Sequence, residues 1–185
     1  MKITGGSSRG KSLVSLNGME IRPTSSKVRE AIFNILGQDL TGFKVLDLFA
    51  GTGILGIEAM SRGAEAAVFI DKSDKSIKTI VKNLSLCGYG GLCRVLKRDL
   101  TKRPAFESLE KKGAIDLVFI DPPYRKEFIP PVLMMLSGCG VLSEQAFVVT
   151  ESSKNDTLPE SAGEIILCDS RIYGETRIDI FRKGY

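Results

Sequence analysis

The sequence predicts an α/β fold, in which helices cover both faces of a mostly parallel sheet and an antiparallel hairpin closes one edge. From Lys44 onward, short apolar runs alternate with amphipathic stretches, a pattern typical of strands joined by crossover helices. Continuous apolar runs such as 117–120 indicate strands that are buried on both faces. Near the end of the chain two strand-like segments follow each other with no helix between them, which predicts the hairpin.

The individual elements follow from turn and capping residues. Residues 1–21 are expected to form short strands separated by glycine turns, the second of them at Asn17-Gly18. Thr24 or Ser25 can cap a helix that Gly37 ends. We expect core strands at 45–49, 67–70, 94–96, 115–120 and 146–149, helices near 54–62, 74–86, 104–112 and 127–137, and closing strands at 164–168 and 177–181 joined through Tyr173-Gly174.

Composition limits the chemistry that the chain can perform. Its 185 residues, 43% hydrophobic and 26% charged, are enough for one domain with its own core. The absence of histidine excludes Ser-His-Asp and Cys-His sites and histidine metal ligands. No two of the four cysteines have C-x-x-C spacing, so we expect free thiols in a reducing cytosol. The N-terminus lacks a signal peptide, and the longest uncharged run, 128–143, is interrupted by prolines and glycines. We therefore expect a cytoplasmic protein without a membrane segment.

The net charge of +4 is concentrated at the N-terminus. Residues 1–30 hold six basic and two acidic residues, and this difference equals the whole net charge. Because local Lys/Arg density drives phosphate binding, this segment is expected to contact a polyanion. The alternative is a solvated basic face with no partner. We expect a basic arm, 1–40, packed on a catalytic domain, 41–185.

A glycine motif follows the first core strand. Gly51, Gly53 and Gly56 fit G-x-G-x-x-G between a predicted strand and a predicted helix. The first two glycines permit a sharp turn and let a ligand approach the backbone, and the third permits close packing of helix on strand. Asp71 ends the next strand, where a carboxylate can accept hydrogen bonds from a ribose diol. The motif predicts a nucleotide-like cofactor, and the alternative is a tight structural turn.

Asp47 distinguishes between two such cofactors. A carboxylate pointing into the cleft would repel the pyrophosphate of NAD, whereas it suits the amino group of S-adenosyl-L-methionine, which carries no phosphate. The pattern D-x-F-x-G-x-G, formed by Asp47, Phe49, Gly51 and Gly53, is similar to motif I of Rossmann-like methyltransferases. We therefore expect S-adenosyl-L-methionine as the methyl donor.

The segment Asp121-Pro122-Pro123-Tyr124 closes the fourth core strand and should face the same cleft. It resembles the motif of methyltransferases that act on exocyclic amines of nucleic-acid bases. The Asp121 carboxylate and the Pro122 carbonyl can accept the two N–H bonds of a base amine, while the prolines hold these acceptors rigidly. Tyr124 offers a face on which an extruded base can stack. The alternative is a Pro-Pro turn in which Asp121 caps a helix.

The N-terminal segment narrows the resemblance to one family of methyltransferases. R-P-T at 22–24 and V-R-E-A-I-F-N-I-L at 28–36, together with both motifs and Tyr173-Gly174-Glu175-Thr176, resemble the RsmD family of bacterial small-subunit ribosomal RNA guanine-N2 methyltransferases. The resemblance covers nearly the whole chain. It implies a Rossmann-like, seven-stranded methyltransferase fold and ribosomal RNA of the small subunit as partner, either free or in an assembled particle. Because the sulfonium is already an activated leaving group, no metal is expected.

The resemblance also suggests roles for further residues. Asp99 and Leu100, at the end of the third strand, are expected near the adenine of the donor. Arg9, Lys11, Arg22 and Arg29 are expected to contact RNA, although Arg22 and Arg29 could instead form an ion pair at the start of a helix with Glu30 or a neighbouring acid. Two alternative functions remain: an adenine-N6 or cytosine-N4 DNA methyltransferase, and an inactive RNA-binding module of the same fold.

Overall fold

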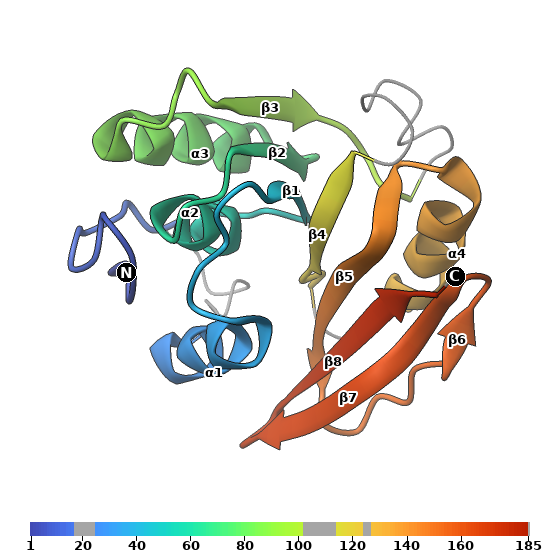
Figure 1. Cartoon of the computed structure of the whole chain (residues 1–185). Coiled ribbons are helices and arrows are strands. Elements are labelled where there is room, and N and C mark those ends of the chain that lie inside the picture. Colours follow the sequence, from blue (N-terminus) through green and yellow to red (C-terminus); the bar gives the residue numbers. More distant parts are fainter. Residues whose placement is uncertain (17–24, 102–113, 124–126, 185) are drawn as a thin grey trace.

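The computed structural model describes residues 1–16, 25–101, 114–123 and 127–184, which form an eight-stranded sheet flanked by helices (Figure 1). The strands are β1 (Lys44–Leu48), β2 (Ala66–Asp71), β3 (Cys93–Lys97), β4 (Ile115–Ile120), β5 (Leu142–Ser153), β6 (Ser161–Ala162), β7 (Ile165–Tyr173) and β8 (Thr176–Lys183). The helices are α1 (Ser26–Leu36), α2 (Ile54–Ser61), α3 (Asp74–Cys87) and α4 (Ile129–Cys139).

The strand order is β3-β2-β1-β4-β5-β8-β7-β6. Strands β1 to β5 are parallel, whereas β8, β7 and β6 pair antiparallel, which confirms the predicted mixed sheet. The family resemblance implied seven strands, and the eighth, β6, has only two residues, too few to leave an apolar pattern in the sequence. The order reverses between β1 and β4, and ligands of open α/β sheets bind at such a switch point.

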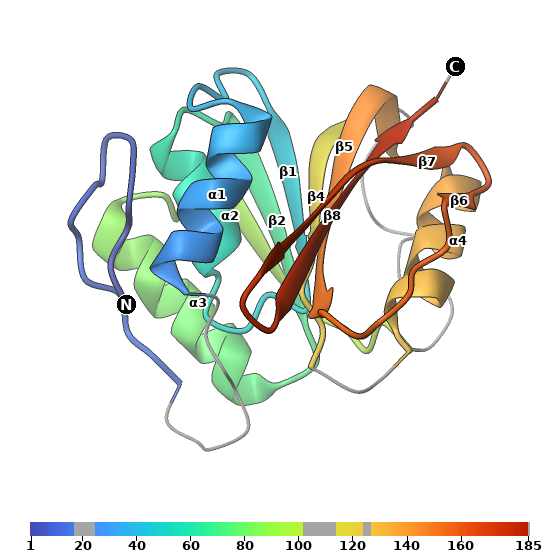
Figure 2. The same ribbon diagram turned by 90° about the horizontal axis from the view of Figure 1, so that it is seen from below.

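Helices α1, α2 and α3 cover one face of the sheet and α4 covers the other (Figure 2). Alternate residues of each strand supply the two cores, since successive side chains point to opposite faces. Val45 packs with α1, α2 and α3, for example, while the next residue, Leu46, packs with α4. None of the helices in the described part of the chain is long and apolar enough to cross a membrane, and all four cysteines are free.

Most element boundaries agree with the sequence prediction to within a few residues. Ser25 caps α1 by accepting a hydrogen bond from the Val28 N–H at 3.2 Å. β5 is much longer than the predicted segment 146–149 because its second half pairs with β8, a contact that apolar periodicity does not reveal. The predicted helix at 104–112 and the predicted turn at Asn17-Gly18 lie outside the described residues.

The first 16 residues lie along α2 and α3 (Figure 2). Their only described ladder contact is an isolated antiparallel bridge between Lys2 and Ser12, so the expected short strands are reduced to a bridge. Ile3 and Leu13 are buried in the core formed with α1, α2 and α3. The division into an arm of 1–40 and a domain of 41–185 stays a prediction.

Candidate active site at the carboxyl edge of the sheet

The glycine loop after β1 makes the sharp turn that its sequence predicts. Phe49, Gly51 and Gly53 all adopt positive φ, at 58°, 57° and 78°. Positive φ is costly for phenylalanine, so the surrounding contacts must hold Phe49 in place. The Gly53 N–H donates to the Ala50 carbonyl at 2.7 Å and closes the turn directly before α2.

Asp71 lies beside this loop, at the end of β2. Its Oδ2 accepts a hydrogen bond from the Gly51 N–H at 2.9 Å, and its Oδ1 accepts one from the Ser73 N–H at 2.8 Å. The side chain is half-buried, so the carboxylate is fixed in direction yet still reachable from solvent. Two further acceptor positions on its oxygens remain for a ligand hydroxyl.

Asp47 departs from the expectation that its carboxylate points into the cleft as a charge. It is 1% exposed, and its Oδ2 accepts the Gly56 N–H at 2.9 Å, so it lies beneath the loop and binds the first turn of α2. Burial raises the pKa of Asp47 to about 8, against the lowering effect of the Gly56 hydrogen bond. A Cβ on Gly56 would overlap the Phe69 ring and stand 3.1 Å from Asp47 Oδ2, which confirms that this third glycine permits close packing.

The loop after β4 meets the glycine loop at the switch point. The register pairs Leu48 with Ile120, so the next residues, Phe49 and Asp121, begin adjacent loops. The Phe49 ring stacks on Phe128, which follows the second loop, with centroids 5.7 Å apart and planes 25° from parallel. Asp121 is half-buried, Pro122 is buried, and Tyr124 lies outside the described residues.

The residues after β3 lie farther from the switch point, since β2 separates β3 from β1. Asp99 is half-buried and accepts hydrogen bonds from the Thr101 N–H at 3.1 Å and the Thr101 hydroxyl at 2.7 Å. Leu100 is 3% exposed and packs in the core beside α4, so its side chain lies in the interior beneath the carboxyl edge of the sheet.

The expected RNA contacts do not all reach the surface. Arg9 and Lys11 are exposed, and Arg22 lies outside the described residues. Arg29 is 3% exposed, contrary to the expectation of a surface cation: its Nη2 donates to the Lys2 carbonyl at 2.8 Å and its Nε lies 3.8 Å from Glu58 Oε2. Arg29 therefore forms an ion pair, as the alternative expected, but its partner is Glu58 of α2 and not Glu30 at the start of its own helix.

The sequence interpretation did not identify Glu58, which binds the first residues of the arm to α2. Its fully buried carboxylate accepts hydrogen bonds from the N–H groups of Thr4 and Gly5, at 2.7 to 3.0 Å, and forms an ion pair with Arg62 at 3.0 Å. The available signal was that Glu58 is the only charged residue of the otherwise apolar helix α2. A charge in that position must be paired to be buried.

Asn83 is a second link that sequence reasoning missed. Its buried side chain on α3 accepts from the Val14 N–H at 2.8 Å and donates to the Val14 carbonyl at 3.1 Å. It also donates to the carbonyl of Thr52, inside the glycine loop, at 2.9 Å. Asn83 thus connects the arm to the loop, and no local pattern in the sequence could indicate this.

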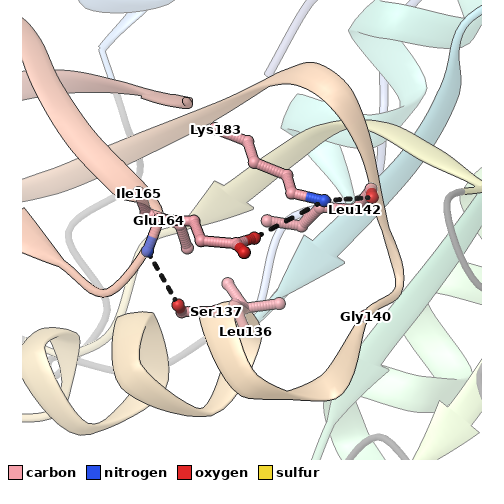
Figure 3. A pocket seen from close by; sticks show the side chains of 7 residues that line it. All are labelled: Leu136, Ser137, Gly140, Leu142, Glu164, Ile165 and Lys183. Carbon is pink, nitrogen blue, oxygen red and sulfur yellow. Dashed lines mark hydrogen bonds and ion pairs between the residues drawn. The ribbon is translucent and has the colours of Figure 1, made fainter. Parts of the chain in front are cut away.

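Two other hollows of the structure lie away from the glycine loop and the Asp121 loop. A shallow groove of about 400 Å³ lies at the opposite, amino-terminal edge of the parallel strands, next to Phe43, Asp116 and Phe147. A small cavity of about 10 Å³ lies between α4 and the strands β7 and β8 (Figure 3). There Ser137 Oγ accepts the Glu164 N–H at 3.1 Å, and the space holds a water at most. In the described residues no group of three or more His, Cys, Asp or Glu side chains could hold a metal.

The strand order, the antiparallel closing strands and the loop between β1 and α2 define a Rossmann-like domain of the methyltransferase class. The family model described as "Conserved hypothetical protein 95" matches residues 1–182, and the chain belongs to this family. The chain is 30% identical to ribosomal RNA small subunit methyltransferase D of Escherichia coli K12 over 99% of its own length and 90% of that protein. This confirms the resemblance to the RsmD family.

Solved structures share the fold of this chain. A conserved hypothetical protein of Streptococcus pyogenes is 38% identical, with a TM-score of 0.77 over 84% of this chain and 95% of that one. An RNA methyltransferase of Salinibacter ruber, in complex with S-adenosyl-L-homocysteine, has the same fold at 18% identity, with a TM-score of 0.62 over 88% of this chain and 94% of that one.

Proposed function

We propose that this protein transfers a methyl group from S-adenosyl-L-methionine to the exocyclic N2 amine of a guanine in small-subunit ribosomal RNA. Its family and its relative in Escherichia coli support this activity. The observation that carries it is the meeting of the glycine loop and the Asp121 loop at the switch point, since it brings a donor site next to a set of amine acceptors.

The hydrogen bonds of the loop favour this donor over a dinucleotide. In Rossmann folds that bind pyrophosphate, backbone N–H groups of the glycine turn face the phosphates. Here the Gly51 N–H is donated to Asp71 and the Gly53 N–H to Ala50, and residues 47–56 include no basic side chain. A pyrophosphate bound at this turn would face the negatively charged Asp71 carboxylate at the place where it needs hydrogen-bond donors. A ribose diol instead finds an oriented acceptor in Asp71, and the donor carries no phosphate, so the residues present fit it.

The acceptor side uses the loop after β4. The donor, when bound, supplies a methyl group on a positively charged sulfur. The Asp121 carboxylate and the Pro122 carbonyl are suited to accept the two N–H bonds of the base amine and to draw its lone pair out of conjugation with the ring. Pro122 is buried and its ring limits the backbone, so these acceptors need little reorganisation as the amine becomes tetrahedral.

The relatives favour RNA over DNA, and the exposed basic residues Arg9 and Lys11 of the arm are suited to contact its phosphates. The substrate is either free ribosomal RNA or an assembled subunit, and the reaction takes place in the cytoplasm.

The test is single-turnover methylation of small-subunit ribosomal RNA by an Asp121→Ala enzyme. We expect the rate to fall by roughly 10²–10³-fold with little change in donor affinity, because the lost contact strengthens only as the methyl group transfers. Asp121→Asn should be milder, since it keeps one acceptor oxygen. Asp156→Ala, at an exposed loop position, is the matched control. A near-normal rate for Asp121→Ala would overturn the catalytic assignment, and methylation of duplex DNA in preference to RNA would overturn the substrate.

A further inference from the structure

A second basic region lies outside the arm, in the segment that forms α3 and β3. Residues 72–98 contain seven basic residues, namely Lys72, Lys75, Lys78, Lys82, Arg94, Lys97 and Arg98, and one acidic residue, Asp74. The net charge of this segment, seven minus one, is +6, which exceeds the +4 of the whole chain. The one acidic residue, Asp74, forms an ion pair with Lys97, its Oδ2 lying 2.7 Å from Lys97 Nζ.

Three of these lysines form a stripe on the outer face of α3. Lys75, Lys78 and Lys82 are all exposed, while Ile80, Asn83 and Leu84 face the interior. Spacings of three and four residues place the lysines on one side of the helix. At 1.5 Å per residue the stripe extends about 10 Å, a length over which one strand of a nucleic-acid duplex carries about three phosphates.

Exposed apolar side chains lie on α3 and in the loop that follows it. Val81 and Leu86 of α3 are 53% and 50% exposed, and Leu92, in the loop to β3, is 55% exposed. These are three of the six large hydrophobic side chains that the described residues expose. Apolar groups between cations are suited to contact bases and sugars while the lysines contact phosphates.

The lysine stripe runs between the arm and the catalytic edge, the two parts of the molecule that the proposed reaction uses. α3 begins directly after Asp71, at the catalytic edge, and its far end lies against the arm (Figure 1). There Ser8 Oγ lies 2.8 Å from the Tyr89 hydroxyl, and Asn83 binds Val14. Arg9, which follows Ser8, and Lys11 are exposed and add basic side chains at this end of α3.

We propose that the outer face of α3, with Lys75, Lys78 and Lys82 at its centre, is an RNA-docking surface that leads the substrate from the arm to the catalytic edge. The inference rests on the proposed function, since it names where the RNA of that reaction lies. Charge complementarity determines the occupant, because the segment 72–98 concentrates positive charge and RNA is a polyanion.

The test compares two triple variants that each remove three positive charges. The first is Lys75→Gln, Lys78→Gln and Lys82→Gln, and the control is Lys154→Gln, Arg171→Gln and Arg182→Gln on and beside β7 and β8. All six positions are exposed, so both variants should fold, which thermal unfolding and donor affinity check. Binding to fluorescent small-subunit ribosomal RNA, both free and in the assembled subunit, is measured at several salt concentrations.

We expect the α3 variant to bind RNA about 10–100-fold more weakly at 0.1 M salt, with a salt slope reduced by about 2 to 3 units, while the control changes the slope by less than one unit. Equal effects of the two variants would overturn the docking surface and leave the proposed methylation intact. An affinity that falls only for the assembled subunit, and not for free RNA, would indicate a ribosomal protein as partner and would also overturn it. Wild-type enzyme that neither binds nor methylates the RNA, whether free or in an assembled subunit, would instead overturn the proposed function.

Discussion

Asp47 makes the stability of this protein depend on pH in a way that one substitution can isolate. The folded-state pKa is about 8, against an ordinary value of 3.8, because the carboxyl group is buried beneath the glycine loop. Its raised pKa means that the folded chain holds a proton which the unfolded chain releases. The stability associated with this proton is fully present below about pH 4 and is lost as the pH rises through about 8.

The size of the effect follows from the slope of about 1.36 kcal/mol per pH unit for one proton. Between pH 5 and pH 7, Asp47 should lower the free energy of unfolding by about 2.7 kcal/mol. Asp47→Asn removes this titration while its side-chain oxygen can still accept the Gly56 N–H, as Asp47 Oδ2 does at 2.9 Å. The free energy of unfolding of the variant minus that of wild type should therefore rise by about 2 to 3 kcal/mol over this interval.

Urea unfolding of both proteins at pH 5, 6 and 7 measures this difference, in which the other titrating groups cancel. Glu65→Gln, at an exposed position, controls for the removal of one negative charge. If the difference between Asp47→Asn and wild type stays constant with pH, Asp47 titrates alike in the folded and unfolded chains, and the reasoning from burial is refuted.

Three further substitutions test the contacts around the loop. Glu58→Leu should lower the free energy of unfolding by about 3–5 kcal/mol, because Arg29 loses its buried partner, and a loss below about 1 kcal/mol in urea would contradict this. Asp71→Ala should weaken donor binding by about 1–3 kcal/mol through lost hydrogen bonds, and an unchanged calorimetric affinity would remove Asp71 from the site. Asn83→Ala should destabilise the fold by about 1–3 kcal/mol and speed proteolysis of the arm near Val14; cleavage at the wild-type rate would argue against the link.

Local signals predicted the sheet and both loops well. Apolar runs located β1, β2 and β4, and the glycines at 51 and 53 indicated the positive-φ turn that the structure shows. The stacking of Phe49 on Phe128 had no such signal, because the two residues are far apart in sequence and become neighbours only when β4 inserts beside β1.

The charged residues show the limit of sequence reasoning most clearly. An arginine in a basic segment gives the same sequence signal whether its side chain faces solvent or the interior. The sequence therefore could not distinguish the buried Arg29 from the exposed Arg9. Only the packing of α1 against α2 buries it beside Glu58. Asp47 has the same ambiguity, since its position in the motif was evident while its protonation depends on the burial that the loop and α2 create.

The sequence alone determined what depends on neighbours along the chain: the alternation of strands and helices, the turns that glycine permits, the absence of histidine chemistry and the presence of both methyltransferase motifs. The tertiary structure decided what depends on distance and burial between segments that the chain separates. It placed the two motifs side by side, committed the Gly51 N–H to Asp71, buried Arg29 and joined the arm to α3. Hydrogen bonding and desolvation act through space, and the order of residues does not contain those distances until the chain folds.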